Sequence, residues 1–281
     1  MDTTLKRLFI LICLPVLMFL YALAIGFALP VNLLLYCLAI TFLVHWVIGL
    51  PSLIAKTEFY FDFTGSLATL SMLTYLLFNA NLSQRAILLL VLCAIWTIRL
   101  GSFLFYRIHK YKIDRRFNTL KQSYLSFAIT WQLSAVWTFL TILAAITAIV
   151  SPLQKPLVIL DYIFVIFWFI SFCIETIADM QKLKFKKHGG DLPFITTGLW
   201  RYSRHPNYFG EISLWFFVAF LALPNLFSWL YLSLISPIFV LLLLTKISGI
   251  NLLESANDKK YGHLPEYREY KKHTPVLFPK I

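Results

Sequence analysis

Long runs of apolar residues constrain this chain more than any other feature of its sequence. A helix needs about 20 mainly apolar residues to cross the hydrocarbon core of a bilayer. Such runs cover residues 8–29, 31–54, 63–78, 86–105, 127–150, 157–178, 208–223 and 227–247. The pattern predicts an all-α, polytopic integral membrane helix bundle of about eight transmembrane helices. Seven to nine are possible, because the runs at 63–78 and 208–223 are the shortest.

The composition supports a membrane protein and argues against a soluble domain. Of the 281 residues, 59% are hydrophobic and only 14% are charged, whereas soluble domains contain about 25% charged residues. The longest polar stretch between apolar runs, residues 179–206, is too short for a separate domain. We therefore expect a single membrane domain over residues 1–281, made of an N-terminal helical pair at 1–54 and a second region at 55–281.

The 25 basic residues outnumber the 13 acidic ones, and most of them lie between the apolar runs. With eight spans, the basic segments 107–121 and 181–204 and the tail after residue 246 all fall on one side of the membrane. Arg85 and Lys155 fall on the other side. Because cytoplasmic loops carry an excess of Lys and Arg, both termini are predicted to be cytoplasmic. This topology accounts for the charge without a nucleic-acid partner.

Neither metal-ligand spacings nor glycine-rich nucleotide loops occur in the sequence. The four cysteines lie inside apolar runs, and the histidines show no HExxH-type spacing. No metal is therefore predicted. A Rossmann or Walker glycine pattern is also lacking, so any nucleotide would have to be held by helix ends and loops.

The densest group of hydrogen-bonding side chains is GLWRYSRHPNYFGE, residues 198–211. Its proline favours a helix start, where free N–H groups attract an anion. Arg201 and Arg204 can bind phosphate or carboxylate through two parallel hydrogen bonds. Asn207 and Glu211 are four residues apart, so one helical face can present an amide and a carboxylate. The alternative is a basic collar with interfacial tyrosines beside the membrane.

Several segments together resemble a known family. They are GLWRYSRHPNYFGE, the preceding ADMQKLKFK at 178–186, SGINLLE and YREYKKHTPVLFP near the C-terminus, and TEFYFDFTGS at 57–66. The chain resembles the DUF1295 proteins of the steroid 5α-reductase superfamily over residues 55–281, which we therefore describe as the reductase-like region.

The resemblance implies a membrane reductase that transfers hydride from NADPH to a conjugated enone of a lipophilic substrate, such as a steroid or sterol. A protein acid would polarise the carbonyl, as in 3-oxo-4-ene steroid 5α-reductases. Glu58 matches the catalytic glutamate of those enzymes. Trp96 occupies the position expected for their tyrosine, so Tyr60, the tyrosine nearest to Glu58, and Asp62 complete the predicted catalytic group.

The resemblance also implies a cofactor site that faces the cytoplasm. Asp179 and Lys186 match a cofactor-binding acid and base, and Asn207 and Glu211 match the residues that hold the nicotinamide end. The remaining predicted NADPH ligands are Arg201, Arg204, His205, Tyr208, Arg107, Arg115 and Arg116. The last three could instead be part of the positive-inside collar.

Two alternative functions remain open at this point. Arg204, His205, Pro206, Tyr208 and Gly210 also fit the RHPxYxG pattern of S-adenosylmethionine-dependent isoprenylcysteine carboxyl methyltransferases. A transporter or a non-catalytic scaffold is a third reading, although transporters commonly bind substrate at the midplane between repeats. We expect a bacterial inner-membrane protein in contact with membrane lipid; the sequence leaves its oligomeric state open.

Overall fold

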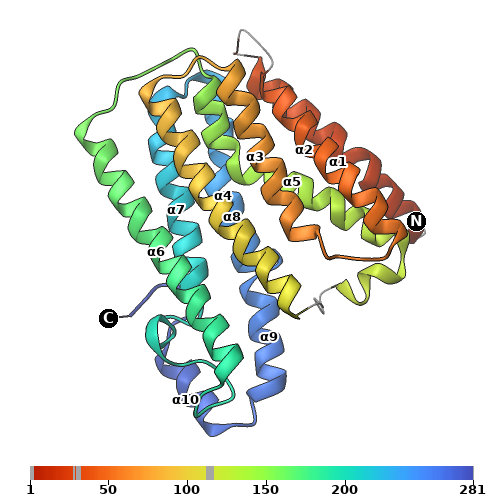
Figure 1. The fold of residues 1–281 in the computed structure, drawn as a ribbon, viewed down its shortest axis with the longest axis vertical. Coiled ribbons are helices and arrows are strands. Elements are labelled where there is room, and N and C mark those ends of the chain that lie inside the picture. Colours follow the sequence, from red (N-terminus) through yellow and green to blue (C-terminus); the bar gives the residue numbers. More distant parts are fainter. Residues whose placement is uncertain (1–2, 28, 30–32, 112–116, 281) are drawn as a thin grey trace. The chain divides into compact units, whose positions relative to one another are not determined.

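The computed structural model describes residues 3–27, 29, 33–111 and 117–280 (Figure 1). The chain is 81% helical, and the described residues contain no strand. Within these ranges, eight helices are long and apolar enough to cross a membrane. The predicted fold class is therefore confirmed, whereas the side on which each terminus lies stays a prediction.

Eight spans follow one another along the described part of the chain. The spans are α1 Thr3–Gly26, α2 Leu33–Ile54, α3 Phe61–Asn79, α4 Gln84–Tyr111, α5 Tyr124–Val150, α6 Ile159–His188, α7 Pro206–Ala222 and a composite eighth span at Ser228–Tyr261. Short turns are η2 Leu120–Gln122, η3 Gly198–Arg201 and η4 Leu223–Asn225. The eighth span contains η5 Ser228–Leu234, α8 Ile235–Leu242, η6 Leu243–Ile247 and α9 Ile250–Tyr261, and α10 Pro265–His273 follows it.

The sixth span continues well beyond its apolar run. Helix α6 ends at His188 rather than near residue 178, and its last turn carries Lys186, Lys187 and His188. Cations are stabilised at a helix C-terminus by the helix dipole. The extension places Asp179 and Lys186 on one continuous rigid helix.

The eighth span is not the single regular helix that the apolar run at 227–247 predicts. It begins as a 3-10 helix, becomes α-helical at Ile235, passes through a π-helical turn at Leu243–Ile247 and continues as α9. Pro237 has no N–H, and its ring crowds the carbonyl four residues earlier, which disfavours a regular α-helix before it. At Gly249, an added Cβ would lie 2.0 Å from the carbonyl oxygen of Leu244. Glycine therefore permits the sharp step into α9.

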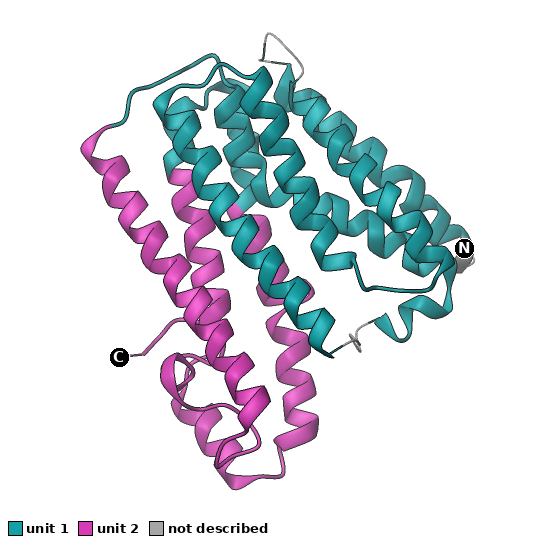
Figure 2. Cartoon of the chain, viewed as in Figure 1, with its two compact units in different colours: residues 1–157, 221–236 teal, residues 158–220, 237–281 magenta. Residues whose placement is uncertain are grey.

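The chain forms two compact units, each built from two stretches of sequence (Figure 2). Unit 1 comprises residues 1–157 and 221–236, and unit 2 comprises residues 158–220 and 237–281. Both units combine spanning helices with connecting segments. The expectation of a single membrane domain, with a pair at 1–54 and a region at 55–281, stays a prediction.

Helix α5 forms the centre of unit 1. Its residues from Thr141 to Ile149 are all buried, as expected of a helix that is apolar on every side. At its other end, Trp131 packs edge-on against Phe61, with ring centroids 5.2 Å apart. A Cβ at Gly49 would come within 3.0 Å of the Trp131 ring. The missing side chain at Gly49 therefore lets α2 approach α5 closely.

A buried arginine in unit 1 connects the start of α4 to the end of α7 and to the segment before α6. Arg85 is 1% exposed. Its Nη1 donates to the Leu221 carbonyl and its Nη2 to the Pro156 carbonyl, both at 2.9 Å, and its Nε reaches the Lys155 carbonyl at 3.4 Å. Carbonyls at such positions have no helical partner. Arg85 therefore supplies hydrogen-bond donors to backbone carbonyls. It also counts toward the distribution of basic residues between the two sides of the membrane.

In unit 2, helices α6 and α7 approach closely at Gly210. A Cβ there would lie 2.6 Å from the Glu175 backbone nitrogen and 2.7 Å from the Ser171 carbonyl oxygen. The loop that follows α6 is fixed to it as well, because Trp200 Nε1 donates to the Ala178 carbonyl at 3.1 Å. The bond from Trp200 holds the loop at residues 198–205 against the side of α6.

Replacing Arg85 with Met should lower the free energy of unfolding by about 3 kcal/mol, because carbonyls that now bond a buried cation would lose their donors. The thermal midpoint of the detergent-solubilised protein would measure the change. Lys155→Met is the matched control, since only the backbone of Lys155 takes part in these bonds. Equal midpoints for the two variants would contradict the structural role of Arg85.

Candidate functional site

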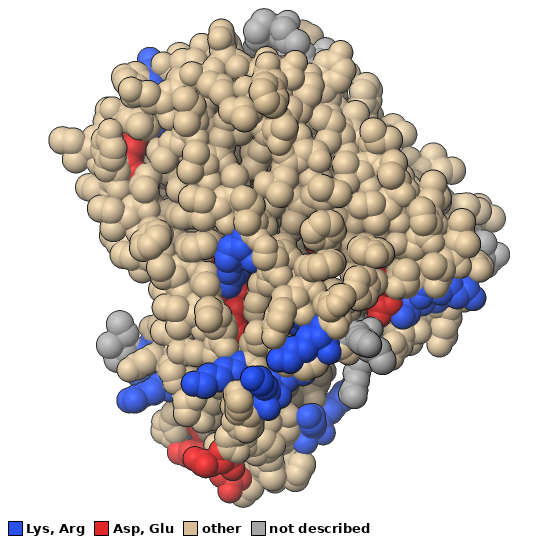
Figure 3. Space-filling view, in the orientation of Figure 1, with Lys and Arg blue, Asp and Glu red and all other residues tan. Residues whose placement is uncertain are grey.

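Two clusters of ionisable side chains stand out, one in each compact unit, and we describe each by itself. In unit 2, the loop between α6 and α7 and the start of α7 carry many of the predicted ligands. Within this unit, Figure 3 shows most of the charged side chains of the visible face around the end that carries α9 and α10. The cluster of unit 2, which is described first, therefore lies where the apolar helices end in charged segments.

Asp179 and Asn207 meet at the interface of α6 and α7. Asp179 is 8% exposed, and Asn207 Nδ2 donates to its Oδ1 at 3.1 Å. Asn207 lies in the first turn of α7, which begins at Pro206, where helix N–H groups favour negative charge. The structure thus brings together an amide and a carboxylate 28 residues apart in sequence.

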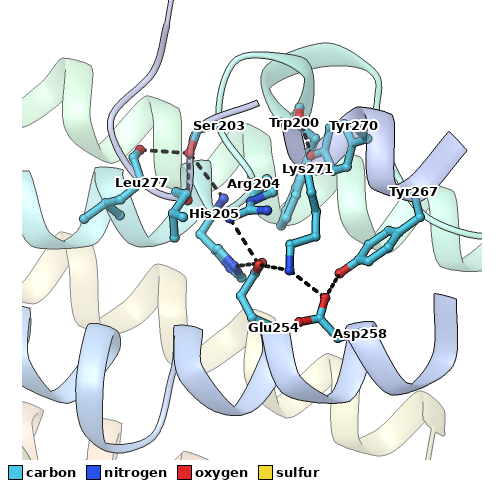
Figure 4. Close-up of polar contacts among 11 residues, drawn as sticks. Trp200, Ser203, Arg204, His205, Glu254, Asp258, Tyr267, Tyr270, Lys271 and Leu277 are labelled. Atoms are coloured by element: carbon cyan, nitrogen blue, oxygen red, sulfur yellow. Dashed lines mark hydrogen bonds and ion pairs between the residues drawn. The ribbon is translucent and has the colours of Figure 1, made fainter. Parts of the chain in front are cut away.

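Arg204 and His205 share one carboxylate, that of Glu254 in α9 (Figure 4). Arg204 Nη2 lies 3.2 Å from Glu254 Oε2, and His205 Nε2 lies 2.9 Å from Oε1. Burial lowers the pKa of His205, and the adjacent Lys182 and Arg204 charges add to this, whereas the bond to Glu254 opposes it. The ring is therefore held neutral, with its proton on Nε2 facing the carboxylate.

A second layer of contacts connects this cluster to the C-terminal helix. Lys271 Nζ lies 2.6 Å from Asp258 Oδ1, and Tyr267 donates to the same oxygen at 3.0 Å (Figure 4). Tyr270 donates to the Trp200 carbonyl at 2.6 Å. Burial raises the pKa of both tyrosines, so their hydroxyls stay protonated and act as donors. Helix α10 is thereby fastened over the loop.

Three polar atoms in this cluster are buried and have no hydrogen-bond partner within the described part of the chain. They are Arg204 Nε, His205 Nδ1 and Asn207 Oδ1. With its proton on Nε2, the neutral ring of His205 has a lone pair on Nδ1. Arg204 thus offers a donor, and the other two atoms offer acceptors. Because an unsatisfied buried polar group costs about 1–3 kcal/mol, such a set is typical of a ligand site.

The other predicted cofactor residues are placed less centrally. Lys186 and Arg201 are exposed, and the Arg201 guanidinium lies over the Tyr202 ring, 5.2 Å from its centroid. Tyr208 stacks on His205 with centroids 5.6 Å apart. Glu211 is half-buried, one turn beyond Asn207 in α7.

The second cluster lies in unit 1, where α3 and α4 meet the segment before α5. Glu58 is 6% exposed, and its Oε2 lies 2.5 Å from Lys121 Nζ. Asp62 accepts from Arg107 Nη2 at 3.3 Å. Both carboxylates border a cavity of about 10 Å³, which aromatic rings also line. Glu58 and Asp62 therefore border the same cavity, and each is paired with a basic side chain.

The structure describes two further residues considered for this cluster, Tyr60 and Trp96. Tyr60 is 46% exposed, and its ring packs edge-on against Phe59. Trp96 is 9% exposed within α4. Arg115 and Arg116 lie outside the described residues. Of Arg107, Arg115 and Arg116, which were predicted as cofactor ligands, the structure thus describes Arg107 alone, and Arg107 pairs with Asp62.

Several members of the two clusters were not predicted as site residues. Lys121 resembled any other basic loop residue, and Glu254 and Asp258 resembled polar residues at the end of the last span. Spacing alone could have indicated one link, because Glu254 and Asp258 are four residues apart and share a helical face. Their partners lie nine or more residues away, beyond the reach of helical spacing, and depend on tertiary packing. Within the described ranges, no group of three or more His, Cys, Asp or Glu side chains could hold a metal ion.

The neutral state of His205 predicts a pH dependence of stability. Since burial lowers its pKa below the unfolded value of about 6.5, the unfolded chain takes up a proton that the folded chain does not. Stability should fall as the pH decreases through about 6.5, by at most about 1.4 kcal/mol per pH unit for this residue. His205→Gln should flatten the profile of unfolding midpoints, and His263→Gln, an exposed control, should not. Parallel profiles for all three proteins would refute the prediction.

The comparisons with known proteins give one family match. The family model described as "Protein of unknown function (DUF1295)" matches residues 45–274. No curated protein and no solved structure matches the chain. The matched region includes all the residues named above in the two clusters, from Glu58 to Lys271. Because the match covers most of the chain, this protein belongs to the DUF1295 family.

Proposed function

We propose that this protein is a membrane-embedded, NADPH-dependent reductase of a conjugated enone in a lipophilic substrate, similar to the steroid 5α-reductases. The observation that carries the proposal is the buried cluster of unit 2. It combines the Asp179–Asn207 pair with unpartnered polar atoms of Arg204, His205 and Asn207. The family's resemblance to the steroid 5α-reductase superfamily and the apolar spans support it further.

The chemical types of the open atoms fit NADPH. Asn207 Oδ1 can accept from the carboxamide of a nicotinamide ring, while Asp179 fixes the orientation of the Asn207 side chain. Arg204 Nε can donate to a phosphate oxygen, and Glu254 holds its guanidinium in place. When bound, NADPH supplies the hydride. The residues of this chain supply binding, orientation and exclusion of water.

In this proposal, the Glu58–Lys121 pair stabilises the negative charge that develops on the enone oxygen. A donor acts most strongly where water is excluded, and Phe59, Phe61 and Phe117 line the cavity that Glu58 borders. An ammonium has three N–H donors, so Lys121 can bond to Glu58 and still donate to a carbonyl. Glu58 then positions the donor. Lys121 thus takes the donor role that the sequence analysis gave to Tyr60, whose side chain is 46% exposed.

Asn207→Leu should weaken NADPH binding about tenfold, which corresponds to losing one or two hydrogen bonds of about 1 kcal/mol each. Fluorescence titration of the purified protein with NADPH would measure the dissociation constant. Asn251→Leu removes an exposed amide from α9 and serves as the matched control. Saturable binding of S-adenosylmethionine, with none of NADPH, would reject the reductase and favour the methyltransferase alternative.

Lys121→Met and Glu58→Gln should each lower enone turnover by about 100-fold, the lower part of the range for proton donors in catalysis. The NADPH dissociation constant should change by less than about twofold, since a group that acts only in the transition state leaves ground-state binding intact. Steady-state rates with a panel of steroid and sterol enones would test this. Lys110→Met, an exposed lysine of α4, is the control. Wild-type turnover in Lys121→Met would exclude the assigned role.

A further inference from the structure

An apolar groove of about 280 Å³ lies on unit 2 between spanning helices and the C-terminal tail. Its lining includes Phe209, Phe216 and Phe217 of α7, Leu241 of α8, and Leu277 and Phe278 of the tail. The rings of Phe209 and Phe278 meet edge-on with centroids 6.0 Å apart. The groove thus offers a hydrocarbon surface that extends from membrane-spanning helices to the segment after α10.

Backbone hydrogen bonds hold the tail in place as one wall of this groove. The Lys280 N–H donates to the Tyr202 carbonyl at 3.0 Å. Ser203 Oγ donates to the Leu277 carbonyl at 2.8 Å (Figure 4). The tail therefore runs beside residues 202–204, and its apolar side chains are fixed against α7.

The same contacts place the backbone of Lys280 close to that of Arg201. Lys280 and Arg201 are both exposed. The bond from Lys280 to Tyr202 places it beside the residue that follows Arg201, and the Arg201 guanidinium lies over the Tyr202 ring. A phosphate between two such cations would gain charge-assisted hydrogen bonds.

We propose that unit 2 binds one anionic phospholipid, with an acyl chain in the groove and its phosphate on Arg201 and Lys280. The groove volume of about 280 Å³ lies just below the range of about 300–1,000 Å³ for drug-sized ligands, and its mainly apolar lining suits a hydrocarbon chain. Basic residues beside a membrane attract anionic lipid. The site goes beyond the reductase proposal and does not depend on it. It also gives Arg201 a role other than that of a cofactor ligand.

The test compares spin-labelled phosphatidylglycerol with spin-labelled phosphatidylcholine on the full-length protein in phosphatidylcholine nanodiscs. Electron paramagnetic resonance measures the motionally restricted fraction of each label. The wild type should restrict phosphatidylglycerol preferentially. Each of Arg201→Gln and Lys280→Gln should lower this preference roughly fivefold, which corresponds to about 1 kcal/mol per basic residue at an anionic surface. The control Lys259→Gln/Lys260→Gln removes two exposed charges from α9 and should keep the preference.

A second arm tests the groove itself. Ser213 lines the groove, so Ser213→Phe should fill it and reduce the restricted fraction of both labels. Ser71→Phe, at a half-buried serine of α3, is the matched control. If Ser213→Phe does not fold, the charge variants still decide the outcome.

Three results would overturn the proposal. The first is a wild type without preference for phosphatidylglycerol, and the second is a preference that survives in Arg201→Gln/Lys280→Gln. The third is displacement of the labelled lipid by inorganic phosphate alone, which would identify a free-phosphate site. If Arg201→Gln/Lys280→Gln loses affinity for NADPH and keeps the lipid preference, Arg201 is a cofactor ligand and not a lipid ligand. Failure of the reductase assays alone would leave the lipid result intact.

Discussion

The lack of water inside a bilayer is the constraint on which this structure depends. A polar group placed between the apolar helices without a partner is costly, because no bulk water is present to replace the missing hydrogen bond. Arg85 meets this demand by donating to a carbonyl at the end of α7 and to one in the connection before α6, and Asn207 does so by donating to Asp179. Spanning helices also contain hydroxyls that donate to their own backbone one turn earlier, such as those of Thr97 and Ser171. Polar side chains are thus arranged by the need for partners.

The same constraint gives the candidate sites their chemistry. Taking Glu58 out of water is tolerated because Lys121 lies against it, and that pairing creates a fixed donor beside a small aromatic-lined cavity. In unit 2, Glu254 gathers Arg204, His205 and Lys271 around one carboxylate. Charges held in this way need little reorganisation when a ligand arrives, which is a general source of binding and catalytic power.

Part of each cluster was predictable because the information is local. The segment at 198–211 concentrates donors and acceptors within a few turns, and a proline marks the start of α7. The pairing of Glu58 with Lys121 was not predictable, because 63 residues separate them and either residue alone resembles a solvated loop charge. For Tyr60, proximity in sequence suggested a shared site, but its position at the start of α3 leaves the side chain exposed.

The sequence by itself determined the class of protein, the number of spans and the family, because the length of an apolar run and a contiguous motif are properties of neighbouring residues. Only the tertiary structure decided how α6 extends past its apolar run, how the eighth span breaks at Gly249, and which basic residue meets each carboxylate. Those outcomes depend on close approach between segments distant in sequence. The local sequence pattern is compatible with several arrangements of these segments. Steric fit and the pairing of buried charges determine which of them forms.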